Sequence, residues 1–159
     1  MTDKAATNIL KIPTTLCPVK MWVHPEGQVI GSLFLHDEHG NEVADDILTL
    51  ANQPEPFLVF KCEMPEELRF YNRNSIIRME YVDKDTTIDN VQSLECQLHM
   101  MDGSLISGTI RETLPPDYSR LYDYLNLTEN RFVKIYTTND EIILINKTYI
   151  NQVTIPQSK

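Results

Sequence analysis

Several features are missing from this chain of 159 residues, and the first is a long apolar run. No run approaches the roughly 18–20 apolar residues needed to cross a bilayer, and the segment from Met1 to Asn8 lacks the apolar core of a secretory signal. Only three cysteines occur, Cys17, Cys62 and Cys96, without Cys-x-x-Cys spacing. These absences predict a cytoplasmic protein with reduced thiols and no inserted membrane segment.

Motifs of the common enzyme classes are also missing. The chain has no nucleophile elbow, no phosphate-binding Walker loop and no dinucleotide fingerprint. His24 and His99 have no nucleophile or carboxylate fixed beside them by spacing, although a triad assembled from distant residues stays open. His36-Asp37-Glu38-His39 could ligate a divalent metal, but Gly40-Asn41 follows it and favours a solvated turn. The sequence therefore predicts a non-catalytic protein without a cofactor or metal.

Positive charge is scarce. The net charge is −9, and neither half of the chain carries a basic stripe. Because most affinity for nucleic acids comes from cations that meet phosphates, this balance disfavours unassisted binding to nucleic acid. An anionic membrane surface is disfavoured for the same reason.

What the chain does have is an internal repeat over residues 19–82 and 94–155. Each copy has a glycine turn, a second glycine inside the next strand, a helix-like segment that ends in Asn, and a closing Asn-basic pair. The matched positions are Gly27 and Gly103, Gly31 and Gly108, Asn52 and Asn126, Asn72-Arg73 and Asn146-Lys147. Halves of about 60 residues are near the lower limit for an independent core, so the copies are expected to pack together.

This pattern predicts a mainly β fold of two tandem, small, five-stranded barrels, each with a short helical insertion. A glycine inside a strand is typical of a sharp bend, which a closing barrel needs. The apolar run Phe57–Phe60 predicts a buried strand. The predicted segments are a flexible N-terminal arm (1–15), a first barrel (16–82), a linker (83–93), a second barrel (94–155) and a tail (156–159).

The second copy resembles the Sm and LSm family of small barrels in two motifs. Leu98, Asp102, Gly103 and Gly108 follow the family's first motif, and Leu144-Ile145-Asn146-Lys147 to Ile150 follows its closing motif. The resemblance implies the fold. It does not extend to the RNA site, because the positions that grip RNA in that family hold Leu114 and Tyr118 here.

Two groups of residues are candidates for specific roles. The paired Asn residues and inner glycines are predicted to be structural, as turns and caps. Aromatic residues that differ between the copies are predicted to anchor a protein interface, because Tyr and Trp are favoured there; core packing is the alternative for Trp22 and Tyr122. The turn and cap positions are Gly31, Gly108, Asn52, Asn126, Asn72 and Asn146, and the interface candidates are Trp22, Tyr71, Tyr118, Tyr122 and Tyr149.

These features predict a protein–protein interaction module, either an adaptor, a scaffold or an assembly component, whose protein partner the sequence does not identify. A homo-oligomer is also expected, with a ring of three chains as one form. An Sm-like nucleic-acid-binding protein is the alternative. A weaker alternative is a sensor of a nucleotide second messenger, because Arg69 and Arg73 have the Arg-x-x-x-Arg spacing of PilZ barrels, although their partner motif is missing.

Overall fold

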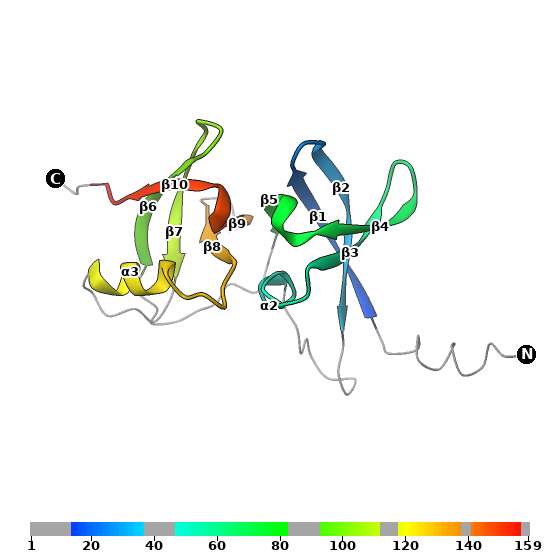
Figure 1. Ribbon diagram of the computed structural model, residues 1–159, viewed down its shortest axis with the longest axis horizontal. Coiled ribbons are helices and arrows are strands. Elements are labelled where there is room, and N and C mark those ends of the chain that lie inside the picture. Colours follow the sequence, from blue (N-terminus) through cyan, green and yellow to red (C-terminus); the bar gives the residue numbers. More distant parts are fainter. Residues whose placement is uncertain (1–13, 37–46, 83–92, 112–117, 138–140, 157–159) are drawn as a thin grey trace, which may run out of the picture.

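The computed structural model describes residues 14–36, 47–82, 93–111, 118–137 and 141–156 (Figure 1). Most of them lie in strands. The first five strands are β1 (Thr14–Val23), β2 (Gly27–His36), β3 (Phe57–Cys62), β4 (Glu67–Asn72) and β5 (Ile76–Val82). The other five are β6 (Ser93–Met100), β7 (Leu105–Arg111), β8 (Phe132–Tyr136), β9 (Glu141–Asn146) and β10 (Ile150–Thr154). The helices are α2 (Ile47–Ala51), α3 (Tyr118–Leu125) and two 3₁₀ turns, η2 (Arg73–Ser75) and η3 (Lys147–Tyr149).

The ten strands form one antiparallel sheet in the order β10-β6-β7-β8-β9-β5-β1-β2-β3-β4. The mainly β prediction is confirmed. The sheet is not closed, so the predicted pair of closed barrels is not what the structure shows. The physical reason lies in the middle, where β9 pairs with β5 from Arg78↔Ile145 to Val82↔Glu141 and thereby joins the two sets of strands.

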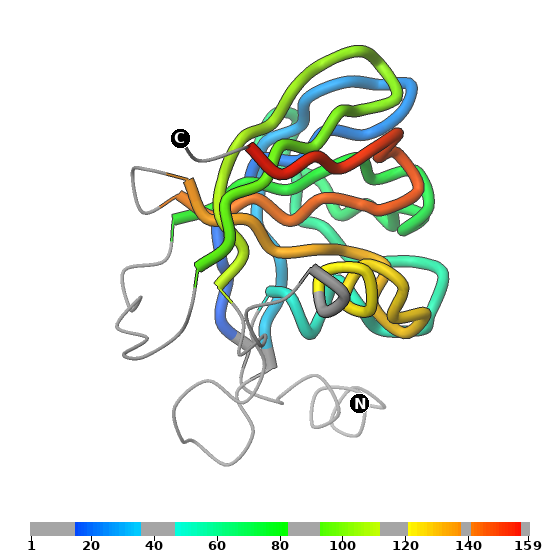
Figure 2. Tube along the Cα trace, turned by 90° about the vertical axis from the view of Figure 1, so that its left-hand side faces the viewer, coloured from blue at the N-terminus to red at the C-terminus, as the bar shows by residue number. Residues whose placement is uncertain are grey.

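The same pairing occurs twice, first in β1–β5 (the first unit) and again in β6–β10 (the second unit). In the first unit Met21 pairs with Met79, and in the second Leu98 pairs with Val153, each just before an irregularity in register. In Figure 2, which looks along the long axis, the turns of hairpins β1–β2 and β6–β7 project to the same end, and α2 and α3 project to the same side. The two units therefore follow one another along the molecule with a similar orientation.

Two hydrophobic cores lie along the sheet, and the first is shared. Its members include residues of the first unit such as Met21, Phe60 and Met79, all fully buried. It also includes four side chains of the second unit, Phe132, Tyr136, Ile142 and Leu144. The second core consists of second-unit residues, with Ile77 of the first unit packed against it. The expected packing of the two halves against each other is therefore a junction in which the second unit completes the core of the first.

Glycine is required at four positions for two reasons. Gly27 and Gly103 have φ values of 99° and 90°, in the left-handed region that residues with a side chain rarely adopt. Gly31 and Gly108 instead lie against a neighbouring strand. A Cβ on Gly31 would collide with the Lys61 carbonyl oxygen and the Phe60 ring, and one on Gly108 with Ile135 and the Tyr136 carbonyl. The inner glycines thus let β2 approach β3, and β7 approach β8.

Most of the predicted arm, linker and tail falls outside the described residues. Of the predicted arm, only Thr14 and Thr15 are described, and they begin β1. The linker is described only at Ser93, where β6 starts, and the tail only at Pro156. The predicted helices correspond to α2, with five residues, and α3, with eight.

Candidate interaction surface

The two outermost strands of the sheet, β4 and β10, have a neighbouring strand on one side only among the described residues. On the other side of each strand, the backbone N–H and C=O groups pair with no described strand. Such an edge can accept a further strand, and natural proteins commonly protect it with charge, proline or a cover.

Beside the β4 edge lies an exposed apolar area, the edge patch, made of Phe57, Val59, Leu68 and Phe70. Val59 pairs with Phe70, and Phe57 and Leu68 lie two residues along on the same face. All four are exposed, and Phe70 keeps 64% of its surface in solvent. The predicted buried strand 57–60 is thus only half buried, since Leu58 and Phe60 point into the core. Large contiguous apolar areas of this kind mark interaction sites.

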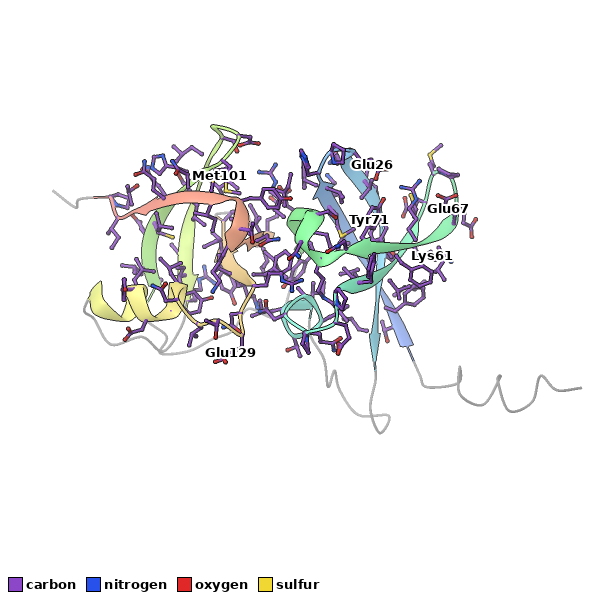
Figure 3. The ribbon with its side chains drawn as sticks, viewed as in Figure 1. Glu26, Lys61, Glu67, Tyr71, Met101 and Glu129 are labelled. Atoms are coloured by element: carbon purple, nitrogen blue, oxygen red, sulfur yellow. The ribbon has the colours of Figure 1, made fainter. Side chains whose placement is uncertain are left out.

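On the opposite face of β4, Tyr71 is held in a polar network (Figure 3). The Arg69 Nη1 atom donates to the Tyr71 hydroxyl at 2.7 Å and to Glu26 at 2.9 Å, while Arg69 Nε donates to Glu67 at 2.7 Å. The Tyr71 hydroxyl donates to Glu26 at 3.0 Å. Burial of Tyr71 raises the pKa of its phenol, and bonding to Tyr71 and Glu67 raises the pKa of Arg69. Tyr71 is therefore a fixed, half-buried residue beside the edge.

The other predicted aromatic anchors lie in different places. Trp22 is half-buried beneath Arg78, whose guanidinium lies 4.1 Å from the ring centroid. Tyr149 is half-buried and its hydroxyl donates to the Asn74 carbonyl at 3.0 Å, so it bridges the units. Tyr122 is 69% exposed on α3, whereas Tyr118 begins that helix and its side chain is outside the described residues. The four described side chains come from four different elements, β1, β4, α3 and η3.

Two of the paired asparagines join the units. The buried Asn146 amide donates to the Ile76 carbonyl at 2.9 Å and the Arg73 carbonyl at 3.3 Å. Asn52, at the end of α2, accepts from the Phe132 N–H at 2.7 Å and donates to its carbonyl at 3.4 Å. The Asn side chains therefore make backbone bonds between distant strands, in addition to local turn bonds.

Asn72 and Asn126, the counterparts of Asn146 and Asn52, make local bonds only. Asn72 and Asn146 each begin a 3₁₀ turn and accept from a backbone N–H two residues on, Asn74 for the first and Thr148 for the second. Within the described residues, however, the Asn72 amide has no acceptor. Asn126 donates to the Tyr122 carbonyl one helical turn earlier. The free amide of Asn72 lies at the end of β4.

The basic residue after Asn72 or Asn146 bonds to backbone carbonyls at the C-terminal end of the helix in its own unit. Arg73 is buried and donates to the carbonyls of Leu50 at 3.0 Å and Phe57 at 2.7 Å, and burial lowers its pKa. Lys147 donates to the carbonyls of Leu125 at 3.0 Å and Leu127 at 2.7 Å, and burial lowers its pKa as well. A cation at the C-terminal end of a helix is stabilised by the exposed carbonyls there.

The cations that could form a nucleic-acid surface are thus partly engaged. Arg73 is buried, Arg69 is paired with two glutamates, and Arg78 Nε lies 3.5 Å from the Glu80 carboxylate. Arg69 and Arg73, which have the Arg-x-x-x-Arg spacing of a second-messenger site, both bond to residues of the first unit. These three arginines are therefore engaged within the first unit.

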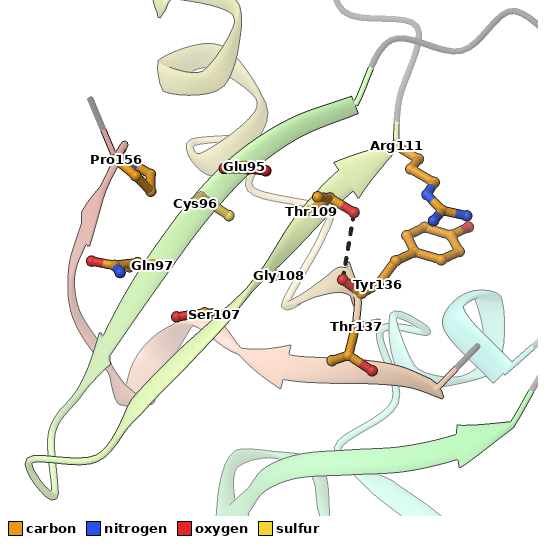
Figure 4. Close-up of a pocket in the computed structure, with 10 residues that line it drawn as sticks. All are labelled: Glu95, Cys96, Gln97, Ser107, Gly108, Thr109, Arg111, Tyr136, Thr137 and Pro156. Atoms are coloured by element: carbon orange, nitrogen blue, oxygen red, sulfur yellow. Dashed lines mark hydrogen bonds between the residues drawn. The ribbon is translucent and has the colours of Figure 1, made fainter. Parts of the chain in front are cut away.

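The second unit contains a groove of about 650 Å³ lined by β6, β7 and β8 (Figure 4). The guanidinium of Arg111 lies 4.5 Å from the Tyr136 ring centroid on one side of it, and Pro156 lies on the other. Cys96 lines the groove, and burial raises the pKa of its thiol to about 11, so the thiol is protonated and unreactive near neutral pH.

Within the described ranges, no group of three or more His, Cys, Asp and Glu side chains gathers that could hold a metal ion. The His36–His39 segment lies outside them except for the backbone of His36. His99 contacts the Thr154 hydroxyl at 3.0 Å and His24 is exposed. None of the described helices is long and apolar enough to span a membrane.

Comparison of the chain with protein-family models, with curated proteins and with solved structures finds no match.

Sequence reasoning missed the edge patch. The aromatics that differ between the copies do not include Phe57 and Phe70, for which the sequence predicts only strand positions. The signal was the alternation Leu68, Arg69, Phe70, which places two apolar side chains on one face of a strand that has a charged residue between them.

Proposed function

We propose that this chain is a non-catalytic, cytoplasmic protein–protein interaction module, acting as an adaptor, a scaffold or an assembly component. One observation carries the proposal: strand β4 has an edge that pairs with no second strand among the described residues, and the exposed edge patch lies beside it. Strand addition needs both features, because main-chain hydrogen bonds supply affinity and alternate side chains supply specificity.

The mode of binding follows from the geometry of β4. A partner strand would pair with the free side of Glu67–Asn72 and place apolar side chains against Leu68 and Phe70. Arg69 and Tyr71 point to the other face, where they bond to Glu26 and Glu67. The partner is therefore expected to offer an extended apolar strand.

The family resemblance, the fold in detail and the location form part of the same proposal. Each unit would be one copy of a duplicated small fold of the Sm-like or SH3-like kind, which the repeated strand order and the repeated inner glycine support. A cytoplasmic location is supported by three cysteines that form no disulfide, of which Cys62 and Cys96 are buried.

The test is purification of the protein from its own cells under mild crosslinking, with and without nuclease. Wild-type protein should bring down a defined protein in both samples. The variant Phe70→Lys should lose it, whereas Met101→Lys, which changes an exposed apolar residue in the β6–β7 turn, should retain it. Recovery of RNA or DNA, with every partner lost after nuclease treatment, would refute the proposal and favour the nucleic-acid alternative.

A further inference from the structure

The junction between the units shows how one unit binds another. Strand β9 lies antiparallel to β5, with Leu144 opposite Met79 and Ile142 opposite Tyr81. Phe132, Ile142 and Leu144 of the second unit are at most 1% exposed and belong to the core of the first. The junction is therefore both a strand pair and a shared apolar core.

The repeat supplies an unused copy of each side of this junction. Phe57 pairs with Asn72 as Phe132 pairs with Asn146, so β4 corresponds to β9. Strand β10 pairs with β6 as β5 pairs with β1, with the same irregularity in register. The free edge β4 thus corresponds to the inserting side of the junction, and the free edge β10 corresponds to the receiving side.

The burial of corresponding residues differs in the direction expected for a missing neighbour. Phe57, Leu68 and Phe70, which correspond to Phe132, Ile142 and Leu144, are 54%, 56% and 64% exposed. The edge patch is therefore the inserting surface without its receiver.

The receiving side shows the same difference. Met79 and Tyr81 on β5 are buried, whereas their counterparts Val153 and Ile155 are half-exposed. The groove beside β10, about 650 Å³, is larger than the corresponding depression beside β5, about 350 Å³, which Glu141 of β9 borders. If a further strand paired with β10 in the way that β9 pairs with β5, that strand would border the larger groove, as β9 borders the smaller one.

The asparagines agree with this correspondence. The Asn146 amide donates to the Arg73 and Ile76 carbonyls across the junction. Asn72 makes the same cap bond as Asn146, but its amide has no acceptor among the described residues. The counterparts of those two carbonyls are those of Lys147 and Ile150. The free Asn72 amide is thus matched to the end of η3 in another copy.

We propose that two copies of this chain associate head to tail, with β4 of one copy added to β10 of the next in the register of the internal junction. Phe70 then lies opposite Val153, and Leu68 lies opposite Ile155. Asn72 donates to the carbonyls of Lys147 and Ile150 in the next copy. This inference rests on the proposed function and names its partner as a second copy of the chain.

Because the two contact surfaces differ, a bound pair still has one free surface of each kind, β10 on one copy and β4 on the other. Such a heterologous contact continues until the rotation between copies closes a ring, or it extends as a filament. The ring of three chains predicted from the sequence is one such closed form.

Two variants that each remove one side of the contact test the inference on purified protein alone. Phe70→Lys damages β4 and Ile155→Lys damages β10, and circular dichroism checks that each still folds. Light scattering should show wild-type protein larger than one chain, as it should for the control Met101→Lys. Each edge variant alone should be monomeric, with association weakened at least about 30-fold, as for a central contact residue.

The mixture of the two edge variants gives the decisive result. The intact β4 of Ile155→Lys should bind the intact β10 of Phe70→Lys, and a dimer of one copy each should form. A wild-type monomer at high concentration, or a mixture that stays monomeric while both variants are folded, would overturn the inference. A wild-type monomer that still captures a nuclease-resistant protein through Phe70 would overturn this inference alone and leave the proposed function standing.

Cysteine pairs test the register without burying a charge. Directly opposed residues in an antiparallel pair have Cα atoms about 4.5–5.5 Å apart, within the reach of a disulfide. Mixing Phe70→Cys with Val153→Cys should therefore give a crosslinked dimer under mild oxidation. Phe70→Cys with Thr154→Cys, shifted by one residue to the other face, should crosslink much more slowly, and equal rates would refute the register.

Discussion

Replacing Asn146 by alanine should weaken the junction more than the same change at Asn72, although the two residues cap equivalent turns. Asn146→Ala removes the cap bond and two donors to buried carbonyls. The cap contributes about 1 kcal/mol, and each buried bond that is left without a partner costs about 1 kcal/mol or more. The free energy of unfolding should therefore fall by about 3 kcal/mol.

Asn72→Ala is the matched control, because it removes the corresponding cap bond to Asn74 and no bond across the junction. It should cost about 1 kcal/mol. Since 1 kcal/mol shifts the melting temperature of a chain of this size by about 2–4 °C, the expected losses are about 6–12 °C for Asn146→Ala and about 2–4 °C for Asn72→Ala.

Urea unfolding followed by the fluorescence of Trp22, the one tryptophan, measures both losses. The protein must be dilute enough that copies do not associate. Equal losses for the two variants, or a loss below about 1 kcal/mol for Asn146→Ala, would refute the reasoning that the buried amide holds the units together. At concentrations where copies associate, the cost of Asn72→Ala should rise toward that of Asn146→Ala.

Three further outcomes are expected. The new Cβ of Gly108→Ala would meet the Tyr136 carbonyl, so the free energy of unfolding should fall by about 1–3 kcal/mol, as is typical of overpacking, and the melting temperature should fall with it. Unchanged melting would show that β7 can move away. The pKa of Glu80 is raised, mainly by burial and also by its bond to Glu141, so folded protein binds a proton more readily than unfolded protein. The free energy of unfolding should therefore decrease as the pH rises from the ordinary glutamate pKa through the raised one, and thermal melts of Glu80→Gln should lose this slope; an identical slope would assign it elsewhere. Cys96, with a pKa of about 11, should react with a thiol reagent at pH 8 only after unfolding, and rapid labelling of folded Cys96 would contradict its burial.

The strands and turns could be predicted because they depend on local signals. Gly27 and Gly103 mark hairpin turns, and the alternation of apolar residues gives most strand positions. The junction could not be predicted from these signals alone, because whether a strand end pairs within its own unit or with the next is decided by packing between residues far apart in sequence. The run Ile142–Ile145 does carry a hint, since four consecutive apolar residues are typical of a strand buried on both faces.

The candidate site was predictable only in part. The paired asparagines were recognised, but their bonds across the junction depend on which strands meet, as for Asn52 with Phe132. Composition favoured Tyr71 as an anchor, whereas the fold satisfies its hydroxyl with Glu26 and Arg69. Phe70 is exposed beside a β4 edge that has no outer neighbour in the described part of the chain, and the position of a strand within a sheet is a property of topology.

The shared first core has a consequence for synthesis on the ribosome. All five strands of the first unit leave the ribosome before β8 and β9, yet Phe132, Ile142 and Leu144 are needed to cover its core. Translation of the intervening segment, on the order of 60 residues, takes several seconds at about 5–20 residues per second. During that interval the nascent chain displays both the edge patch and an uncovered core beside β5, so this protein is expected to depend on a chaperone that binds apolar surface until its C-terminal strands emerge.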